Sequence, residues 1–474
     1  MILGMKSKLL IGAILLCLTV PVQAVAVTKA GDSCKQEGKI QKVGTSTFEC
    51  RVVSKGRQVL VKVTNNRPAI TNVQSPNGLD TCQLTDQRTK VSAPHSIAFP
   101  NKYVYEGFKP AGVHEIAVIP IDFPNSPGKG KPSEIYAPEL KKIDEWLSWY
   151  TNGKMQYKWQ VKDEWIRAPK ESSQYTWIHP GNSGTQGRDS WIFIQELIDI
   201  SLKSYDLKNI SGVFFIYPRD VKDIDDAYTA VQGLNIPGNV GRGYAVTATG
   251  QWLYRNKYPI WAWFIHELLH PHGIAGHAPA YPEQFGIAHN QSGMGLNINA
   301  WDSIILDWAN PEDIFCIDQG ALSKVSLTLV PIEREQKGVR SAVIKISDSQ
   351  ALVVESHRKD KWGSTFKDGF YGVMTYLVDT KVDTDRTGEF QGQDDGKGVQ
   401  WTRNANYLTV PGVNHGQYAM QKVVKGVGVQ GPPYWDLNYV MYQGESLTYK
   451  DVKISFTKTG DNDTIQIERV KQSQ

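Results

Sequence analysis

Beyond its N-terminus, the 474-residue chain has no run of about 18 consecutive apolar residues, the length that a membrane-spanning helix requires. Cysteine is scarce, with 5 residues in all, and no cysteine stands in a Cys-x-x-Cys or Cys/His pattern. Basic runs interleaved with aromatic residues are absent, and the formal net charge is only +4. These absences argue against a stable membrane span, a separate structural zinc site and a nucleic-acid partner.

The N-terminus has the three parts of a secretory signal peptide. Lys6 and Lys8 precede an apolar core from Leu9 to Val20, and small residues, ending in Ala24, follow as a cleavage site. The apolar core is too short for a comfortable membrane span. We therefore predict a signal peptide over residues 1–24 and a secreted, extracellular bacterial protein. An uncleaved anchor is the alternative.

Removal of the signal peptide would leave four cysteines, an even number that suits an oxidising compartment. They are Cys34, Cys50, Cys82 and Cys316. Four cysteines allow three pairings, and the sequence does not choose among them. The short spacing favours a Cys34–Cys50 pair, which would leave Cys82 to join Cys316.

An HExxH motif, His266, Glu267 and His270, lies in the run WAWFIHELLHPHGIAGHAPA. Helical residues i and i+4 share one face, so the two imidazoles can bind one metal ion while Glu267 reaches a metal-bound water. Five of the 10 histidines fall between His266 and His289, which scattering seldom produces. The motif predicts zinc-dependent hydrolysis. The alternative is a helix with two ordinary surface or core histidines.

A catalytic zinc ion needs three protein ligands and an open position for water. Gly273 follows His270 by three residues, where the pattern HExxHxxGxxH uses glycine to end the helix and turn the chain back under the metal. The third ligand of that pattern would fall on Gly276, and the next residue is His277. We predict His277 as the third ligand, with one added residue in the turn.

Other residues near the motif are alternative third ligands. His277 could instead be an exposed loop histidine, and the fallback ligands are His289 and Asp302. His272 follows His270 by only two positions, so it should point away from the metal as a supporting or surface residue.

At this point the sequence resembles the immune inhibitor A type of secreted bacterial metallopeptidases, members of the metzincin group. Besides the zinc motif, the resemblance rests on four stretches: Trp146–Val161, Asn297–Ile314, Ala351–Arg358 and Gly369–Thr380. It covers roughly residues 110 to 465. The resemblance implies a metzincin-like catalytic domain, in which a mixed sheet accompanies a zinc-binding helix.

Two positions depart from the family pattern. The family commonly has an aspartate as third ligand where this chain has Gly276, so the prediction of His277 comes from this chain alone. Metzincins also place a methionine in a tight turn beneath the metal. Met294 is the nearby candidate here, and ordinary packing explains it equally well. The tyrosine that some metzincins add two residues later is replaced by Leu296.

The chain divides into sections with different patterns. After the signal peptide we predict a small Cys-stapled β module over residues 30–64, a linker or pro-like segment over 65–111, a catalytic domain over 112–320 and a β-rich accessory domain over 321–474. The predicted fold class is α+β, with a β-sandwich-like C-terminal domain.

Within the catalytic domain, periodicity predicts five elements ahead of the zinc helix. They are strands at His114–Phe123 and Gly212–Pro218, helices at Pro138–Thr151 and Ser190–Asp206, and an edge strand beside the cleft at Gly243–Tyr254.

The predicted function is that of a monomeric, secreted zinc endopeptidase acting on a protein or peptide. Zn²⁺ held by His266, His270 and His277 would lower the pKa of its water, and Glu267 would act as general base. The alternatives are a non-catalytic surface or matrix-binding protein that keeps the fold, and a zinc hydrolase of cell-wall peptides. Acidic clusters could hold structural Ca²⁺, although solvated loops are the favoured interpretation. The clusters are Asp223, Asp225 and Asp226, and Asp394 and Asp395.

Overall fold

A computed structural model describes most of the chain after the predicted signal peptide. The described residues are 32–34, 40–43, 46–54, 57–63, 78–88, 97–101, 108–175, 188–224, 228–230, 234–237, 245–250, 253, 259–274, 286–288, 296–364, 372–382, 408–409 and 440–470. The predicted signal peptide lies outside them. No helix within these ranges is both long enough and apolar enough to cross a membrane.

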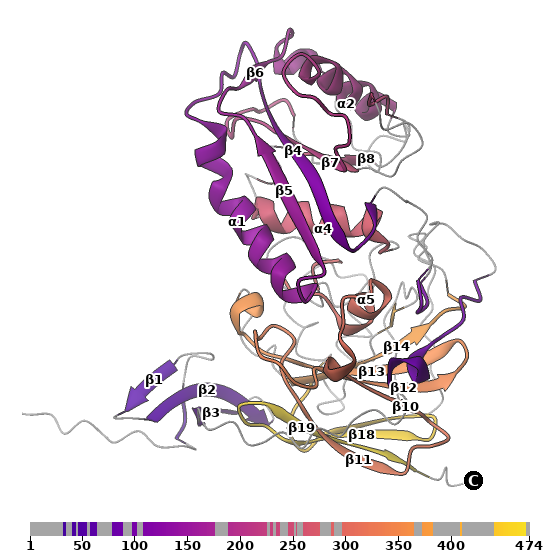
Figure 1. The fold of residues 1–474 in the computed structure, drawn as a ribbon. Coiled ribbons are helices and arrows are strands. Elements are labelled where there is room, and N and C mark those ends of the chain that lie inside the picture. Colours follow the sequence, from indigo (N-terminus) through magenta and orange to yellow (C-terminus); the bar gives the residue numbers. More distant parts are fainter. Residues whose placement is uncertain are drawn as a thin grey trace, which may run out of the picture.

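A mixed six-stranded sheet forms the upper part of the molecule in Figure 1. Its strands are β4 (Gly112–Asp122), β5 (Met155–Val161), β6 (Ile166–Arg167), β7 (Gly212–Ile216), β8 (Tyr228–Ala230) and β9 (Ala245–Ala248). Their order is β5-β4-β7-β9-β8, and β6 also pairs with β4. All pairs are parallel except β8 with β9. The predicted edge strand, β9, is therefore second from the edge, because β8 covers it.

Helices lie on both faces of this sheet. They are α1 (Pro132–Tyr150), α2 (Arg188–Ser201) and α4 (Ile260–His272). Alternate residues of β4 point to opposite sides: Ile116 packs in the core formed with α1 and α4, and Ala117 in the core formed with α2. Since both faces are covered, the central strands β4 and β7 read as nearly continuous apolar runs.

The C-terminal part is a sandwich of two sheets. The six-stranded sheet contains β10 (Ile314–Asp318), β12 (Ser341–Ser347), β13 (Gln350–His357), β14 (Gly372–Asp379), β15 (Leu408–Thr409) and β16 (Val440–Met441). The four-stranded sheet contains β11 (Lys324–Leu329), β17 (Ser446–Tyr449), β18 (Val452–Lys458) and β19 (Asp463–Arg469). One apolar core joins their facing sides. β10 pairs in parallel with β12, so this sandwich begins before residue 321.

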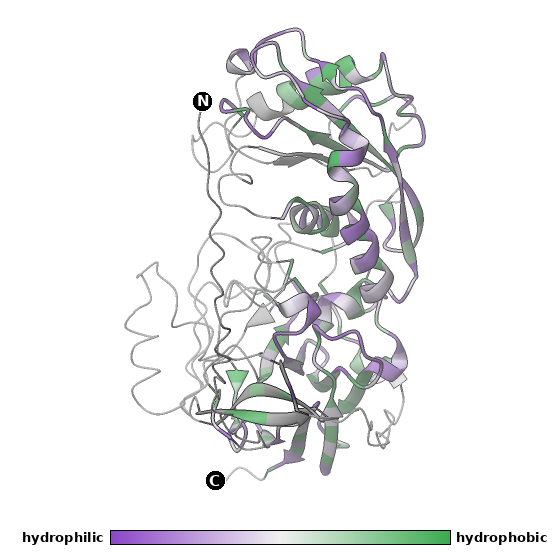
Figure 2. Cartoon of the chain, turned by 90° about the vertical axis from the view of Figure 1, so that its left-hand side faces the viewer, coloured by the Kyte–Doolittle hydropathy of each residue, from purple (hydrophilic) through white to green (hydrophobic). Residues whose placement is uncertain are grey.

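A layer of helix separates the upper sheet from the sandwich. It contains α4, seen nearly end-on in Figure 2, and the short helix α5 (Ala300–Ile305). Residues of β4, α4, α5 and β13 belong to one continuous apolar core. The two predicted domains therefore share a core along this layer. Short 3-10 helices η1 (Gly78–Cys82), η3 (Ser172–Gln174), η4 (Pro311–Asp313) and η5 (Lys361–Gly363) complete the described helices.

The described N-terminal residues form a separate small sheet of β1 (Ile40–Val43), β2 (Ser46–Ser54) and β3 (Arg57–Val63). Its strands are antiparallel, and a Cys34–Cys50 disulfide closes it. The second disulfide joins Cys82 to Cys316. Both bonds follow the pairing that the sequence spacing favours.

Part of the segment predicted as a linker packs against the sandwich. The Thr85 backbone N–H donates to the Asp348 carbonyl at 2.7 Å, and the Gln87 N–H donates to the Thr380 carbonyl at 3.0 Å. Farther along, the Ile97 carbonyl accepts a hydrogen bond from the indole of Trp301 at 3.0 Å. The described residues of this segment thus belong to the folded body.

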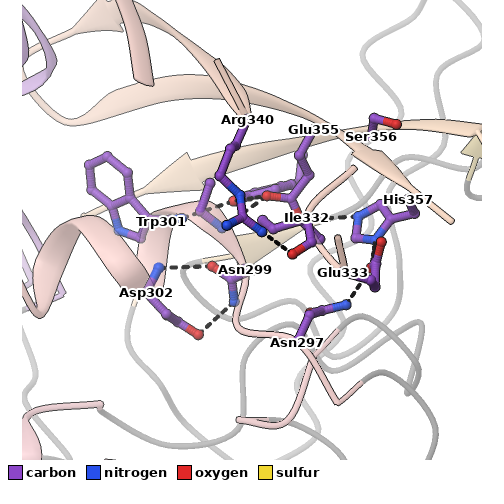
Figure 3. A network of polar contacts seen from close by, with 12 residues as sticks. Asn297, Asn299, Trp301, Asp302, Ile332, Glu333, Arg340, Glu355, Ser356 and His357 are labelled. Atoms are coloured by element: carbon purple, nitrogen blue, oxygen red, sulfur yellow. Dashed lines mark hydrogen bonds and ion pairs between the residues drawn. The ribbon is translucent and has the colours of Figure 1, made fainter. Parts of the chain in front are cut away.

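A buried charged group lies where the sandwich meets α5 (Figure 3). The imidazole of His357 stands between two carboxylates, with Nδ1 2.6 Å from Glu333 Oε1 and Nε2 3.1 Å from Glu355 Oε1, and all three side chains are fully buried. We call them the Glu–His–Glu group. Burial alone would lower the pKa of His357, but the two carboxylates raise that pKa to about 10. His357 is therefore an imidazolium that donates from both nitrogens.

This raised pKa predicts a pH-dependent contribution to stability. The pKa of His357 is about 10 in the folded protein against 6.5 ordinarily, so its contribution is complete below pH 6.5 and is lost as pH rises through about 10. We expect His357→Gln to lower the free energy of unfolding by a few kcal/mol near pH 7, to order of magnitude, and by less at high pH. Urea unfolding of both proteins between these pH values measures the difference. A difference that does not change with pH would contradict this assignment.

Candidate metal centre

The helix α4 carries the HExxH motif and is buried on almost every side. Its sequence begins with the apolar run IWAWFI, so no face of its first two turns is polar. The ring of Phe264 stacks on Phe214 of β7 at 3.9 Å between centroids, and Trp261 meets Trp362 of η5 edge-on at 5.8 Å. Of the 13 residues in α4, only Glu267 and His270 are partly exposed. The motif is thus where solvent reaches this helix.

Gly273 ends α4, as the sequence predicts. Its φ of +129° is a backbone conformation that other residues rarely adopt. The N–H of Gly273 donates to the Leu269 carbonyl at 3.1 Å, and the N–H of Ile274 donates to the same carbonyl at 2.9 Å. These bonds satisfy a helix-terminal carbonyl and turn the chain sharply. The path after Ile274 lies outside the described residues.

The three motif side chains converge. Ligand atoms of His266, Glu267 and His270 all lie within 4.8 Å of one another. The two imidazole rings are 5.1 Å apart between centroids and perpendicular. Among the described residues, no other group of three or more histidine, cysteine or acidic side chains brings one ligand atom from each residue within this distance of all the others.

Backbone carbonyls fix the tautomers of both histidines. His266 Nδ1 lies 2.6 Å from the Ile287 carbonyl, and His270 Nδ1 lies 3.1 Å from the Ile274 carbonyl. A carbonyl can only accept, so each Nδ1 carries the proton and each Nε2 has the lone pair that a metal requires. Such a bond on the far ring nitrogen is the usual support of a histidine ligand. The residues present therefore fit a zinc ion.

His272 lies apart from this pair, as expected, but it is a core residue and not a surface one. It is 1% exposed, its Nδ1 donates to the Phe108 carbonyl at 3.1 Å, and its Nε2 accepts from the Tyr157 hydroxyl at 2.7 Å. Its ring stacks on Phe108 at 4.1 Å. Burial, together with the nearby His114, holds the pKa of His272 well below its usual range. Both nitrogens of this neutral ring are engaged, which leaves none for a metal.

His277, the predicted third ligand, lies outside the described residues, as do the fallback ligand His289 and the turn candidate Met294. Asp302 is described and lies at the start of α5. Its backbone N–H donates to Asn299 Oδ1 at 2.8 Å, its carboxylate accepts from Asn299 Nδ2, and it is fully buried. The described structure does not place Asp302 in the motif group. Asp302 thus helps to cap α5.

Of the acidic residues that could hold calcium, the structure describes only Asp223. Asp223 accepts a hydrogen bond from the Ser172 hydroxyl at 2.5 Å. The other four acidic residues, Asp225, Asp226, Asp394 and Asp395, lie outside the described residues. This hydrogen bond joins the loop that contains Asp223 to η3.

Sequence reasoning missed the partners of the histidine rings. The carbonyls of Ile274 and Ile287 are backbone atoms, so no residue type marks them. In the sequence, Tyr157 reads as an ordinary aromatic residue of a strand. Its hydroxyl reaches His272 because β5 pairs in parallel with β4.

A scan against protein-family models, a search of curated proteins and a search of solved structures each found no match. The site must therefore be interpreted from its own geometry.

The hydrogen bond between the buried Tyr157 hydroxyl and His272 of α4 can be tested by a substitution. We expect Tyr157→Phe to lower the free energy of unfolding by about 1–3 kcal/mol, because it leaves His272 Nε2 buried without a donor. Denaturant unfolding at neutral pH measures this loss. A variant as stable as the wild type would show that the Tyr157–His272 bond contributes nothing.

Proposed function

We propose that the protein is a secreted zinc-dependent endopeptidase of the metzincin group, similar to the immune inhibitor A metallopeptidases. One observation carries the proposal: two histidines of a buried helix hold their Nδ1 protons on backbone carbonyls and offer Nε2 beside a partly exposed glutamate. A sheet followed by the motif helix is consistent with the predicted catalytic domain.

The residues of this chain have distinct roles in the proposed hydrolysis. A zinc ion bound here would supply Lewis acidity, which lowers the pKa of water and polarises a peptide carbonyl. His266 and His270 would hold the metal, each oriented by its own carbonyl bond. Glu267 would accept the proton of the attacking water and pass it to the leaving amine. Its partial exposure allows water and substrate to reach the carboxylate.

We propose His277 as the third ligand. The described contacts that support it are at the start of the turn, where Gly273 ends the helix and the carbonyl of Ile274 returns to His270 Nδ1. A reversal at Gly273 would bring the residues that follow towards the motif face. Zinc would then have three histidine ligands and one position for water.

The extracellular location and the protein substrate belong to the same proposal. Two disulfides fit an oxidising compartment. We expect a monomer that acts on proteins or peptides. Hydrolysis of peptidoglycan peptides but not of casein would instead favour the cell-wall alternative, and absence of both activities in a zinc-loaded protein would favour a non-catalytic binding protein.

The general base is tested by Glu267→Gln. We expect this variant to lose casein hydrolysis while keeping zinc, because the amide preserves the shape of the side chain and leaves both imidazoles in place. Metal analysis and a casein assay on the same preparation make the measurement. Loss of zinc together with activity would mean that Glu267 is a ligand or a structural residue.

The third ligand is tested by His277→Ala with His289→Ala as the matched control. We expect His277→Ala to reduce both zinc content and hydrolysis severely, because two remaining ligands cannot enforce tetrahedral geometry. His289→Ala should be much milder. The reverse result, or loss of zinc in Asp302→Ala alone, would place the third ligand downstream of the turn.

A further inference from the structure

We propose that the Glu–His–Glu group of the C-terminal sandwich positions His266, with Asn297 as the connecting residue. The inference rests on the proposed function, since it assigns a positioning role toward the zinc site to residues outside the motif. The sandwich would then be part of the metal centre, and not an appended module.

The connection begins at the ring of His266. Its Nδ1 donates to the carbonyl of Ile287 at 2.6 Å, and the N–H of Ile287 donates to the carbonyl of Asn297 at 2.8 Å. The two segments are in close contact, since a Cβ on Gly286 would lie 3.1 Å from Asn297 Oδ1. The position of the Ile287 carbonyl is therefore set by the backbone at Asn297.

Asn297 is held in turn by the Glu–His–Glu group. It is fully buried, and its Nδ2 donates to Glu333 Oε1 at 2.6 Å, the same oxygen that accepts from His357. The backbone N–H of Arg358 donates to the other oxygen, Glu333 Oε2, at 2.9 Å. The carboxylate thus has fixed donors on both oxygens, which leaves it little freedom to move away from Asn297.

The second carboxylate holds the same segment a few residues later. Glu355 Oε2 accepts from the N–H of Ala300 at 2.9 Å and from the Tyr376 hydroxyl at 3.3 Å. The Tyr376 oxygen also accepts from the N–H of Trp301 at 3.1 Å. Asn297 and the start of α5 are therefore anchored to two carboxylates that one imidazolium holds together (Figure 3).

A second buried ion pair of the sandwich provides a matched control. Arg358 and Asp463 are paired and buried, and Asp463 Oδ2 also accepts from the Ser356 hydroxyl at 2.7 Å. These side-chain bonds join the end of β13, and Arg358 directly after it, to β19 of the other sheet. Asp463→Asn changes side-chain contacts alone, so the backbone N–H of Arg358 that binds Glu333 stays in place; the variant should loosen the sandwich without changing the bonds of Asn297.

The experiment compares the zinc affinity of the wild type with that of Asn297→Ala, Glu333→Gln and Asp463→Asn. Chelator competition at pH 7.5 measures the affinity, and circular dichroism checks that each full-length variant is folded. We expect Asn297→Ala and Glu333→Gln to bind zinc about 10- to 100-fold more weakly, the usual effect of removing an outer partner of a metal ligand. Asp463→Asn should bind zinc as tightly as the wild type, even where it is less stable.

A metal-free measurement gives an independent readout. In ¹⁵N NMR spectra of the metal-free protein, His266 should be the Nδ1-protonated tautomer in the wild type and a mixture of tautomers in Asn297→Ala. A purely structural role of the network would lower stability without changing this signature. If Glu333→Gln fails to fold, Asn297→Ala still decides, because it leaves the buried charges in place.

The possible outcomes separate the two proposals. Wild-type zinc affinity and an unchanged His266 tautomer in Asn297→Ala would overturn the positioning role alone. Equal loss of zinc in Asp463→Asn would also overturn it, by showing that general loosening is the cause. A wild type that binds no zinc would overturn the proposed function and the positioning role together.

Discussion

Burial of α4 between the upper sheet and the sandwich is the constraint on which the candidate site depends. In a helix packed on almost every side by aromatic and aliphatic residues, a buried imidazole N–H needs an acceptor, because an unpaired buried polar group costs about 1–3 kcal/mol. Each described histidine of the helix consequently has a carbonyl acceptor. In His266 and His270 this bond makes Nε2 the nitrogen that could bind a metal, and in His272 the Tyr157 hydroxyl donates to Nε2. Packing therefore separates the two candidate ligands from the core histidine.

The sequence predicts only part of the site and of the fold. The features that it predicts depend on residues close together in the chain, and the features that it misses depend on long-range contacts. Gly273 acts within one turn of helix, so its role as helix terminus could be predicted and is confirmed. The Cys34–Cys50 pair follows from short spacing. In the fold, the alternating runs predicted the sandwich, but the edge strand β8 of three residues is too short to show periodicity. Strand order and the parallel pairing of β10 depend on long-range contacts that no local pattern encodes.

The Glu–His–Glu group shows the limit of sequence reasoning most clearly. Glu355 and His357 lie two residues apart in β13, where an alternating pattern puts both on one face, yet the surrounding run reads as an ordinary buried strand. Glu333 comes from a turn outside any strand. Buried charges of this kind seldom add stability compared with apolar packing. Their presence fits a requirement for defined geometry, since two carboxylates fix the segment from Asn297 to Ala300.

The two disulfides close separate, non-overlapping loops of the chain. One bond lies wholly within the small N-terminal sheet, and the other begins at Cys82, after that sheet has ended at Val63. A single cut between residues 63 and 78 would release the N-terminal sheet with its own cross-link intact. A single cut anywhere between Cys82 and Cys316 would release nothing, because the bond spans 234 residues and would hold both fragments together. Proteolytic trimming can therefore remove the first part cleanly, while damage within the motif-bearing part leaves its fragments tethered until the disulfide is reduced.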